Sequence, residues 1–333
     1  MEKRDRNRAA ILAALSRLNT PTSSSSLTAY LAAAGQNLSE RTVRWYLRQL
    51  DEEGLTHCHA RRRTITEKGL GELRAARTLQ RVGYLSARID QMTYSMTFDL
   101  ERQHGQVVVN MSLVEPRDLA ACEGEIRRGF ACGYAMGQLL ALLPPGAALG
   151  TAVVPQGRLG LCTVCSITLN GVLLKHGVPM TSRFGGLLEL RDRQPTRFVE
   201  MIHYDGTSVD PLEVFIRSGM TNCRSAVEDG NGLIGAGFRE VPESSRELAV
   251  SLAHRLSAAG LGGFLEIGWP DQPVLGLPVS PGRVGVVVTG GLNPMAVLEE
   301  RGRRVPFTAL AGLLDYGRLS HYDELPKLVA QYR

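Results

Sequence analysis

Residues 39–55, SERTVRWYLRQLDEEGL, carry two opposite faces at helical spacing. The apolar face recurs every three or four residues and consists of Val43, Tyr46, Leu47 and Leu50. The second face is offset by roughly 200° on a helix of about 3.6 residues per turn, and it carries Arg41, Arg44, Trp45 and Arg48. The pattern predicts an amphipathic helix that buries one face and presents arginines on the other.

Three short helices and two short strands are predicted over the first part of the chain. The apolar spacing places the helices at residues 7–18, from Ser26 onward, and after Ser39, whose hydroxyl can accept a hydrogen bond from a backbone N–H of the first turn. The strands are expected at residues 55–59 and 64–66. This order is that of a winged helix-turn-helix, in which the third helix enters the major groove of DNA and the hairpin tip lies along the backbone.

The arginines of this region have the chemistry of a DNA-binding surface. Guanidinium groups donate to phosphates and to guanine edges, and a hairpin tip is expected to meet phosphates rather than bases. The expected DNA contacts are Ser39, Arg41, Thr42, Arg44 and Arg48 on the third helix, and Arg61, Arg62 and Arg63 at the hairpin tip. The alternatives are a solvated arginine face and a winged helix that binds another protein. Trp45 either stacks on the DNA backbone or packs against a neighbouring helix.

A helical pattern continues through residues 67–98. We interpret residues 76–98 as a connector helix that either helps to pair two subunits or packs on its own body. The predicted organisation is a winged-helix domain at residues 1–75, this connector, and a second domain at residues 99–333.

The second part of the chain has the pattern of mixed helix and strand. Residues 106–114, QVVVNMSLV, have the apolar run of a buried strand. Residues 117–143 have a helical pattern that places Gly129, Gly133 and Gly137 on one face, where another backbone can come close.

Two segments of this part resemble each other. GVPMTSRFGGLLEL at residues 177–190 is similar to GLPVSPGRVGVVVTG at residues 276–290, and each is later followed by a turn with Gly, then Asp or Asn, then Pro. We interpret the similarity as an internal duplication, roughly over residues 160–216 and 262–302. The expected fold class is therefore α+β, with an N-terminal winged helix-turn-helix followed by an internally duplicated α/β regulatory domain.

Polar positions of this domain suit a small anion. GLCTVCSITLNGVLL has the composition of a buried strand, and Ser166, Thr168 and Asn170 alternate along it, which would place them on one side. Arg183 lies in the glycine-rich bend TSRFGG and Arg239 in GAGFREVP, where a guanidinium can hold a carboxylate bidentately. An internal salt bridge to a nearby glutamate is the competing explanation.

Charge is unevenly distributed along the chain. The first 81 residues contain 15 Lys and Arg against 8 Asp and Glu, a net charge of +7, whereas the remainder carries 23 against 25, a net of −2. A basic end joined to a near-neutral body is typical of a module that meets a polyanion. The first residues do not have the pattern of a secretory signal, and Pro144 and Pro145 interrupt the longest uncharged run. We therefore expect a cytoplasmic protein without a membrane span.

Motif content favours a ligand sensor over an enzyme. The sequence has no Gly-x-Ser-x-Gly elbow, Walker loop or HExxH motif. Cys162 and Cys165 form a CxxC pair with no second pair to complete four ligands, so we expect no metal and no cofactor. Two other classes remain as alternatives. One is a metabolite-acting enzyme that uses the Cys165 region and carries a winged-helix interaction module, and the other is an architectural protein without a ligand.

Four long stretches resemble the regulatory domain of the NrpR nitrogen-regulation repressors. They are TVCSITLNGVLLKHGVPMTSRFGGLLEL, RFVEMIHYDGTSVDPLEVFI, GLIGAGFREVP and PVLGLPVSPGRVGVVVTGGLNPMAVLEE. The N-terminal winged helix resembles theirs as well, so the resemblance covers nearly the whole chain.

This resemblance implies a repressor of nitrogen-assimilation genes that binds double-stranded DNA as a homodimer or a dimer of dimers and releases it when 2-oxoglutarate binds. The chemistry above, laid on the resemblance, gives the expected effector-binding residues Cys165, Ser166, Thr168, Arg183, Gly185, Gly186, Thr207, Ser208 and Arg239. Many archaeal relatives carry two regulatory domains in tandem, whereas this chain has one. A repressor that answers a different small anion is therefore an alternative.

Overall fold

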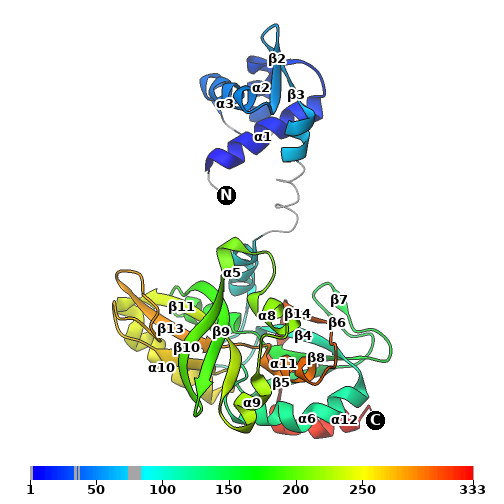
Figure 1. The fold of residues 1–333 in the computed structure, drawn as a ribbon, viewed down its shortest axis with the longest axis vertical. Helices are drawn as coiled ribbons and strands as arrows, with labels where there is room; N and C mark the ends of the chain where they lie inside the picture. Colours follow the sequence, from blue (N-terminus) through cyan, green and yellow to red (C-terminus); the bar gives the residue numbers. More distant parts are fainter. Residues whose placement is uncertain (1–2, 34–35, 37, 74–83, 333) are drawn as a thin grey trace. The chain divides into compact units, whose positions relative to one another are not determined.

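The computed structural model describes residues 3–33, 36, 38–73 and 84–332. The chain forms two compact units, residues 1–83 and 84–333, and each has its own buried apolar cluster (Figure 1). Within the described residues, no helix is both long enough and apolar enough to cross a membrane.

The first unit combines helices with a small antiparallel sheet of order β1-β3-β2. Its elements are α1 (Lys3–Leu18), β1 (Thr22–Ser23), α2 (Ser24–Ala33), α3 (Glu40–Glu52), β2 (Thr56–His59) and β3 (Arg62–Ile65). This is the winged helix-turn-helix arrangement that the sequence predicts.

The two faces predicted for α3 are confirmed. All four apolar residues of the predicted face are buried, and the three arginines of the opposite face are exposed. The Ser39 hydroxyl caps the helix by accepting a hydrogen bond from the Thr42 N–H at 3.1 Å. α2 begins two residues earlier than expected, because the Ser23 hydroxyl accepts from the Ser26 N–H at 3.2 Å and provides the cap that Ser26 was expected to supply.

The second unit opens with α5 (Leu85–Ser95), which packs against α7 and β14 of the same unit and buries Leu85 and Ile89. The last part of the expected connector therefore packs on its own body, and residues 76–83 lie outside the described residues.

After α5 the unit contains two halves with the same element order, β-α-β-β-α-β. The first half comprises β4 (Gln106–Val114), α6 (Pro116–Ala131), β5 (Leu139–Leu143), β8 (Leu159–Val164), α7 (Ile167–Lys175) and β9 (Thr181–Arg191). The second comprises β11 (Gly232–Pro242), α10 (Arg246–Ala258), β12 (Phe264–Ile267), β13 (Arg283–Thr289), α11 (Asn293–Glu300) and β14 (Phe307–Asp315).

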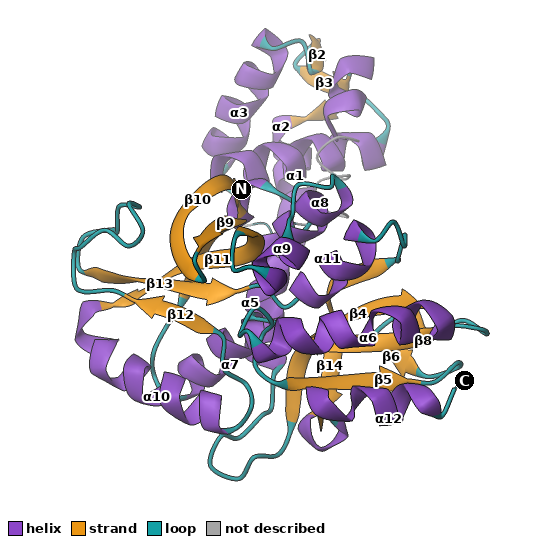
Figure 2. Ribbon diagram, turned by 60° about the horizontal axis from the view of Figure 1, so that its bottom comes forward, coloured by secondary structure: helices purple, strands orange, loops and turns teal. Residues whose placement is uncertain are grey.

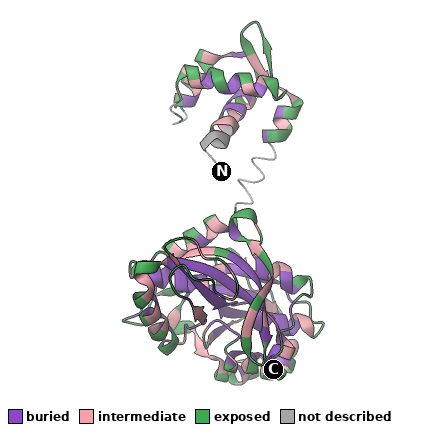
Figure 3. Cartoon of the chain, turned by 60° about the vertical axis from the view of Figure 1, so that its left-hand side comes forward, coloured by how far each residue is buried: buried purple, intermediate pink, exposed green. Residues whose placement is uncertain are grey.

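The two halves exchange their last strands. β14 of the second half pairs with β4 of the first, and β9 of the first half pairs with β11 of the second. The resulting sheets have the orders β14-β4-β8-β5-β15 and β10-β9-β11-β13-β12, with β10 (Gln194–His203) and β15 (Ser320–His321) at their edges. Figure 2 shows the sheets as two separate groups of strands, and Figure 3 shows that most strand residues of this unit are buried. Apart from the edge strands, each sheet has the order of a ferredoxin-like unit whose fourth strand comes from the other half.

Strand register and buried hydrogen bonds show which residues of the halves correspond. Val109 of β4 lies opposite Val164 of β8, and Ala236 of β11 lies opposite Thr289 of β13. The Thr168 hydroxyl hydrogen bonds to both the N–H and the C=O of Val108. In the same way, the Asn293 side chain hydrogen bonds to both the N–H and the C=O of Gly235.

This correspondence differs from the repeat predicted at residues 160–216 and 262–302. In the structure β8 corresponds to β13 and β9 corresponds to β14, whereas the sequence similarity aligned β9 with β13. The residues that the two segments share are mostly glycines and prolines of the turn before a strand. Turns of this composition precede many strands, including strands that are not equivalent in the two halves. The halves extend over a larger part of the unit than the predicted repeat does.

The helix predicted at residues 117–143 is too long. α6 ends at Ala131 because Gly133 has a φ of 77°, a left-handed conformation that ends helices, and β5 follows at Leu139. Gly137 has a φ of 72° and lies against the chain at Gly260, where a Cβ would come within 2.2 Å of the carbonyl oxygen. Only Gly129 of the three glycines is therefore in the helix, and the expected glycine face is absent.

The strand predicted through TVCSITLN is also too long. β8 ends at Val164, and α7 begins at Ile167. Ser166 and Thr168 therefore lie at the start of a helix instead of on one side of a strand. Each half changes from strand to helix within a few residues. Alternate residues across this junction therefore do not lie on one side of a strand.

Candidate functional site

The arginine face of α3 is exposed and is only partly engaged by the rest of its unit. The Arg44 side chain is paired with Glu40 at 2.6 Å and donates to the Ser24 hydroxyl at 3.1 Å. In the described part of the chain, Arg41 and Arg48 form no hydrogen bond or ion pair through their side chains. On α3, the side chains of Arg41 and Arg48 are therefore available to bind a ligand, whereas Arg44 is held in a fixed position.

Trp45 lies between these arginines, and its ring packs edge-on against Tyr46 with a centroid distance of 4.8 Å. Its side chain remains 48% exposed. The ring is therefore packed on its own helix and also accessible to a ligand of the arginine face.

The hairpin places two of its three arginines at the expected position. Its turn is at Ala60 and Arg61, which have φ values of 48° and 62°, and Arg62 follows at the exposed start of β3. Arg63 lies within β3, and its Nε donates to Asp51 of α3 at 3.0 Å. The hairpin tip therefore carries Arg61 and Arg62, whereas Arg63 joins the hairpin to α3, because β3 begins two residues earlier than predicted.

A buried arginine forms the centre of a second candidate site, in the second unit. Arg239 of β11 is 0% exposed. Its Nη1 donates to the Ser166 carbonyl at 2.8 Å and its Nη2 to the Ser166 hydroxyl at 2.6 Å. Its Nε has no hydrogen-bond partner among the described residues. Burial lowers the pKa of Arg239, and the nearby Tyr204, Cys165 and Asp210 oppose that change.

Two residues that the sequence did not single out as ligands lie near this guanidinium. Tyr204 is buried, and burial raises the pKa of its hydroxyl. Asp210 caps α8 (Pro211–Arg217) by accepting from the Leu212 N–H at 2.9 Å. Burial, with a smaller contribution from Glu213, raises the pKa of Asp210 to about 6. The sequence shows an Asp-Pro turn at Asp210, but no local signal places Tyr204 or Asp210 beside a strand that begins more than twenty positions later.

The structure brings together only some of the expected effector residues. Cys165 and Ser166 lie beside Arg239, and Gly185 lies under Tyr204, whose hydroxyl oxygen would be 3.0 Å from a Cβ at that position. Thr168 is committed to the backbone of Val108.

The remaining expected residues lie elsewhere. Arg183 is 46% exposed and lies 3.7 Å from Glu240. Gly186 provides room for the ring of Phe198 and the carbonyl of Glu200. Thr207 hydrogen bonds within its own loop to Val209, and Ser208 lies in that loop. These four residues therefore do not form one site with Arg239.

The cysteines of the CxxC pair have the environment of packed thiols. Burial raises the pKa of Cys162 and of Cys165 to about 12 in each case. A thiol of this kind is a weak nucleophile and a weak metal ligand at neutral pH. In the described residues, no group of three His, Cys, Asp or Glu side chains is placed to hold a metal ion.

Comparison with known proteins decides the family. A family model described as NrpR regulatory domains NRD1 and 2 matches residues 82–321, which is most of the chain. The protein belongs to the NrpR family. A second model, described as the ribonuclease R winged-helix domain, matches residues 9–73 and agrees with the fold of the first unit.

Relatives in the NrpR family are named as regulators, in agreement with the expectation that the chain is not an enzyme. The global nitrogen regulator NrpRI of Methanosarcina mazei is 34% identical over 85% of this chain and 87% of its own length. The global nitrogen regulator NrpR of Methanococcus maripaludis is 31% identical over 92% of this chain but only 53% of its own length. The chain therefore spans most of one relative and about half of the other.

A solved structure shares its fold with most of the chain. The crystal structure of a nitrogen repressor-like protein from Methanococcus jannaschii matches 72% of this chain and 99% of its own, with a TM-score of 0.61 and 26% sequence identity.

Proposed function

We propose that the protein is a transcriptional repressor of nitrogen-assimilation genes that binds operator DNA through α3 and the hairpin tip and releases it when 2-oxoglutarate binds the second unit. Membership of the NrpR family supports the nitrogen-regulatory role. The exposed arginines of the winged helix support the DNA-binding role, because a recognition helix reads base edges with side chains of this kind.

On the DNA side, Arg41 and Arg48 are the proposed base-reading residues, since neither is engaged by the rest of the unit. Arg44 is held by Glu40 and Ser24, so we assign it to a phosphate at a fixed position. Arg61 and Arg62 are the proposed phosphate contacts of the hairpin tip. We further propose that the repressor acts in the cytoplasm as a homodimer, because a dimer presents two such helices to the two half-sites of one operator.

On the effector side, the guanidinium of Arg239 carries the proposal. It is fully buried, its hydrogen-bond partners Ser166 and Met180 are uncharged, and the nearby Asp210 carboxylate caps α8 instead of hydrogen bonding to the guanidinium. The equivalent of the Ser166 carbonyl in the other half is that of Gly291, and there the Thr163 hydroxyl donates at 2.6 Å. A neutral hydroxyl is therefore sufficient for the fold at this position. The fold therefore does not need a charged donor to bind the Ser166 carbonyl. The buried positive charge of Arg239 suits a carboxylate of 2-oxoglutarate.

Binding at this position must open the space around Arg239, because the side chain has no exposed surface. The surrounding groups belong to the turn before α7 and to the segment before α8, so these are the elements that we expect to move. 2-Oxoglutarate shifts the protein between DNA-binding and released states only to the extent that it binds one of them more tightly.

The first experiment selects an operator from genomic fragments and measures its binding by fluorescence anisotropy with and without 2-oxoglutarate. We expect 2-oxoglutarate to weaken binding, and glutarate and oxaloacetate to act less strongly. Calorimetric titration with the same three compounds reports binding to the protein itself. Operator binding that is unchanged at a saturating concentration of 2-oxoglutarate would contradict the proposed effector role.

Two variants test the DNA-binding surface. Arg48→Ala should abolish preference for the operator, while Arg17→Ala, which removes an exposed arginine from α1, is the matched control and should retain it. Arg61→Ala should weaken binding to all DNA sequences alike and reduce the slope of log affinity against log salt by about 1. Operator preference retained in Arg48→Ala would place the base-reading surface elsewhere.

A further inference from the structure

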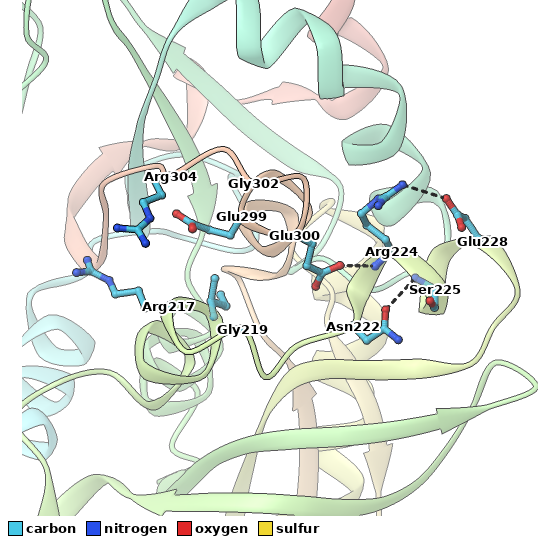
Figure 4. Close-up of a pocket in the computed structure, with 11 residues that line it drawn as sticks. Arg217, Gly219, Asn222, Arg224, Ser225, Glu228, Glu299, Glu300, Gly302 and Arg304 are labelled. Carbon is cyan, nitrogen blue, oxygen red and sulfur yellow. Dashed lines mark hydrogen bonds and ion pairs between the residues drawn. The ribbon is translucent and has the colours of Figure 1, made fainter.

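A cavity of about 540 Å³ opens in the second unit beside the end of α8, α9 (Cys223–Glu228) and the end of α11 (Figure 4). Its charged lining residues are Arg217, Arg224, Arg304, Glu228, Glu299 and Glu300. Among the described residues, no hydrogen bond or ion pair joins this lining to Arg239, so we treat the cavity as separate from the proposed effector site, and its function does not depend on that proposal.

One wall of the cavity is fully engaged in internal contacts. The Glu300 carboxylate accepts hydrogen bonds from the Thr221 hydroxyl and from the backbone N–H groups of Cys223 and Arg224, at 2.8 to 2.9 Å. The Arg224 side chain donates to Glu125 at 3.2 Å and lies 3.6 Å from Glu228. These groups fix the shape of the wall and have little capacity left for a ligand.

The opposite end of the cavity has unused capacity. In the described part of the chain, the exposed Arg304 side chain has no hydrogen-bond or ion-pair partner. Arg217 is held in place by a hydrogen bond to the Phe307 carbonyl at 3.0 Å and by an ion pair with Glu213 at 3.6 Å, and its guanidinium lies over the Phe307 ring. One oxygen of Glu299 accepts from the Val305 N–H at 2.7 Å, and the other is bonded to no described residue. Figure 4 shows Arg217, Arg304 and Glu299 together at this end.

The charges of the lining indicate what kind of ligand fits. Three guanidinium groups and three carboxylates line the cavity, so its formal charge is balanced. A dianion would gain at Arg217 and Arg304 but would be repelled by Glu299 beside them. A ligand with a carboxylate and an ammonium on one carbon matches both signs at once, because its two charges lie as close together as those of the protein.

We propose that this cavity binds a free α-amino acid with a polar side chain. The carboxylate lies between Arg304 and Arg217, the ammonium donates to the open oxygen of Glu299, and the side chain extends toward Asn222 and Ser225, which line the other end. The volume lies within the range of about 300 to 1,000 Å³ that is usual for small-molecule pockets, so an amino acid and several waters fit.

The test begins with a thermal-shift scan of the full-length protein against the standard amino acids at millimolar concentration. L-Glutamine is then compared calorimetrically with glutaramic acid, which lacks the ammonium, and with 4-aminobutanamide, which lacks the carboxylate. We expect L-glutamine to bind at least tenfold more tightly than either analogue, since each analogue leaves one charged end of the cavity unpaired. The absence of binding by every amino acid, or equal binding by one of the two analogues, would overturn the proposal.

Variants locate the binding. Arg304→Gln should weaken L-glutamine at least tenfold, whereas Arg318→Gln, which removes an exposed arginine away from the cavity, should leave it unchanged. Because Arg304 is exposed and unpaired, we expect Arg304→Gln to unfold at the same temperature as the native chain. The proposal requires that Arg304→Gln still binds 2-oxoglutarate as the native chain does, and loss of both ligands would overturn the assignment of two sites. Failure of 2-oxoglutarate to bind the native chain would contradict only the proposed function.

Discussion

The two halves of the second unit share their topology and their register but differ in how each satisfies one carbonyl. In the first half the Ser166 carbonyl accepts from the charged Arg239, and in the second half the Gly291 carbonyl accepts from the neutral Thr163. The residue that corresponds to Arg239 is Ser112, whose buried hydroxyl has no partner among the described residues. The scaffold is therefore symmetric, while the charged contact between the halves is made at only one of these two equivalent places.

The turns before α7 and α11 also differ between the two halves. A Cβ at Gly291 would come within 2.3 Å of the Val164 carbonyl oxygen and 2.6 Å of the Asn110 side chain, so this position has room only for glycine. Ser166, at the equivalent position, carries a side chain that contacts Arg239. At Gly291 the space is filled by the backbone and a side chain of the first half, whereas Ser166 provides polar groups at the equivalent place.

The largest effect is expected where the halves are most alike. Asn293→Leu leaves the N–H and C=O of Gly235 and the carbonyl of Tyr134 without this buried partner, and it should lower the free energy of unfolding by about 3 kcal/mol. Thr168→Val removes the equivalent bonds to Val108 and should cost about 2 kcal/mol. Urea unfolding measures both, with Thr151→Val at an exposed position as the control. A negligible loss in both core variants would show that these bonds do not hold the halves together.

The second prediction concerns the difference between the halves. Arg239→Met should reduce the affinity for 2-oxoglutarate at least tenfold, and it should also lower the free energy of unfolding because the Ser166 carbonyl and hydroxyl lose their buried donor. Ser112→Ala, at the equivalent position, should leave the affinity unchanged. Calorimetric titration and urea unfolding of the same samples separate the two effects. A native-like 2-oxoglutarate affinity in Arg239→Met would assign Arg239 to structure alone.

The smallest expected effect is a dependence on pH. Burial raises the pKa of Asp210 to about 6, so the folded protein binds this proton more tightly than the unfolded chain does. The sign follows directly: stability from this group is present below the unfolded pKa of about 4 and is lost as the pH rises toward about 6. Asp210→Asn keeps a good helix cap and should make stability less dependent on pH across that window. Urea midpoints at both ends of the window give the measurement, and equal dependence in the two proteins would contradict it.

The sequence predicted surface features of this protein better than buried ones. The two faces of α3 and the Ser39 cap follow from spacing within one helix, and both are confirmed. The contact between Ser166 and Arg239 joins residues 73 positions apart and is produced by strand order, for which the sequence has no local signal. Tyr204 illustrates the same limit, because a lone tyrosine in a polar segment gives no indication that it will be buried.

The predicted elements that differ from the structure share a physical cause. Glycines at left-handed positions and abrupt changes from strand to helix both interrupt periodic patterns, and periodicity continued past Gly133 and past Val164 as if neither interruption existed. The duplication was recognised, but its alignment depended on turn residues. Strand register and the equivalent hydrogen bonds of Thr168 and Asn293 arise only when the sheets form, so the sequence alone did not indicate them.

The exchanged strands have an evolutionary consequence. Two identical copies of one half, each lending its last strand to the other, would form a symmetric swapped dimer with the same two sheets. Joining the copies in a single chain keeps this architecture and releases each copy from the constraint of identity. A gene fusion of this kind gives one copy freedom to acquire Arg239 while its twin has Ser112 at the equivalent position, which accounts for a symmetric scaffold with a single buried arginine contact.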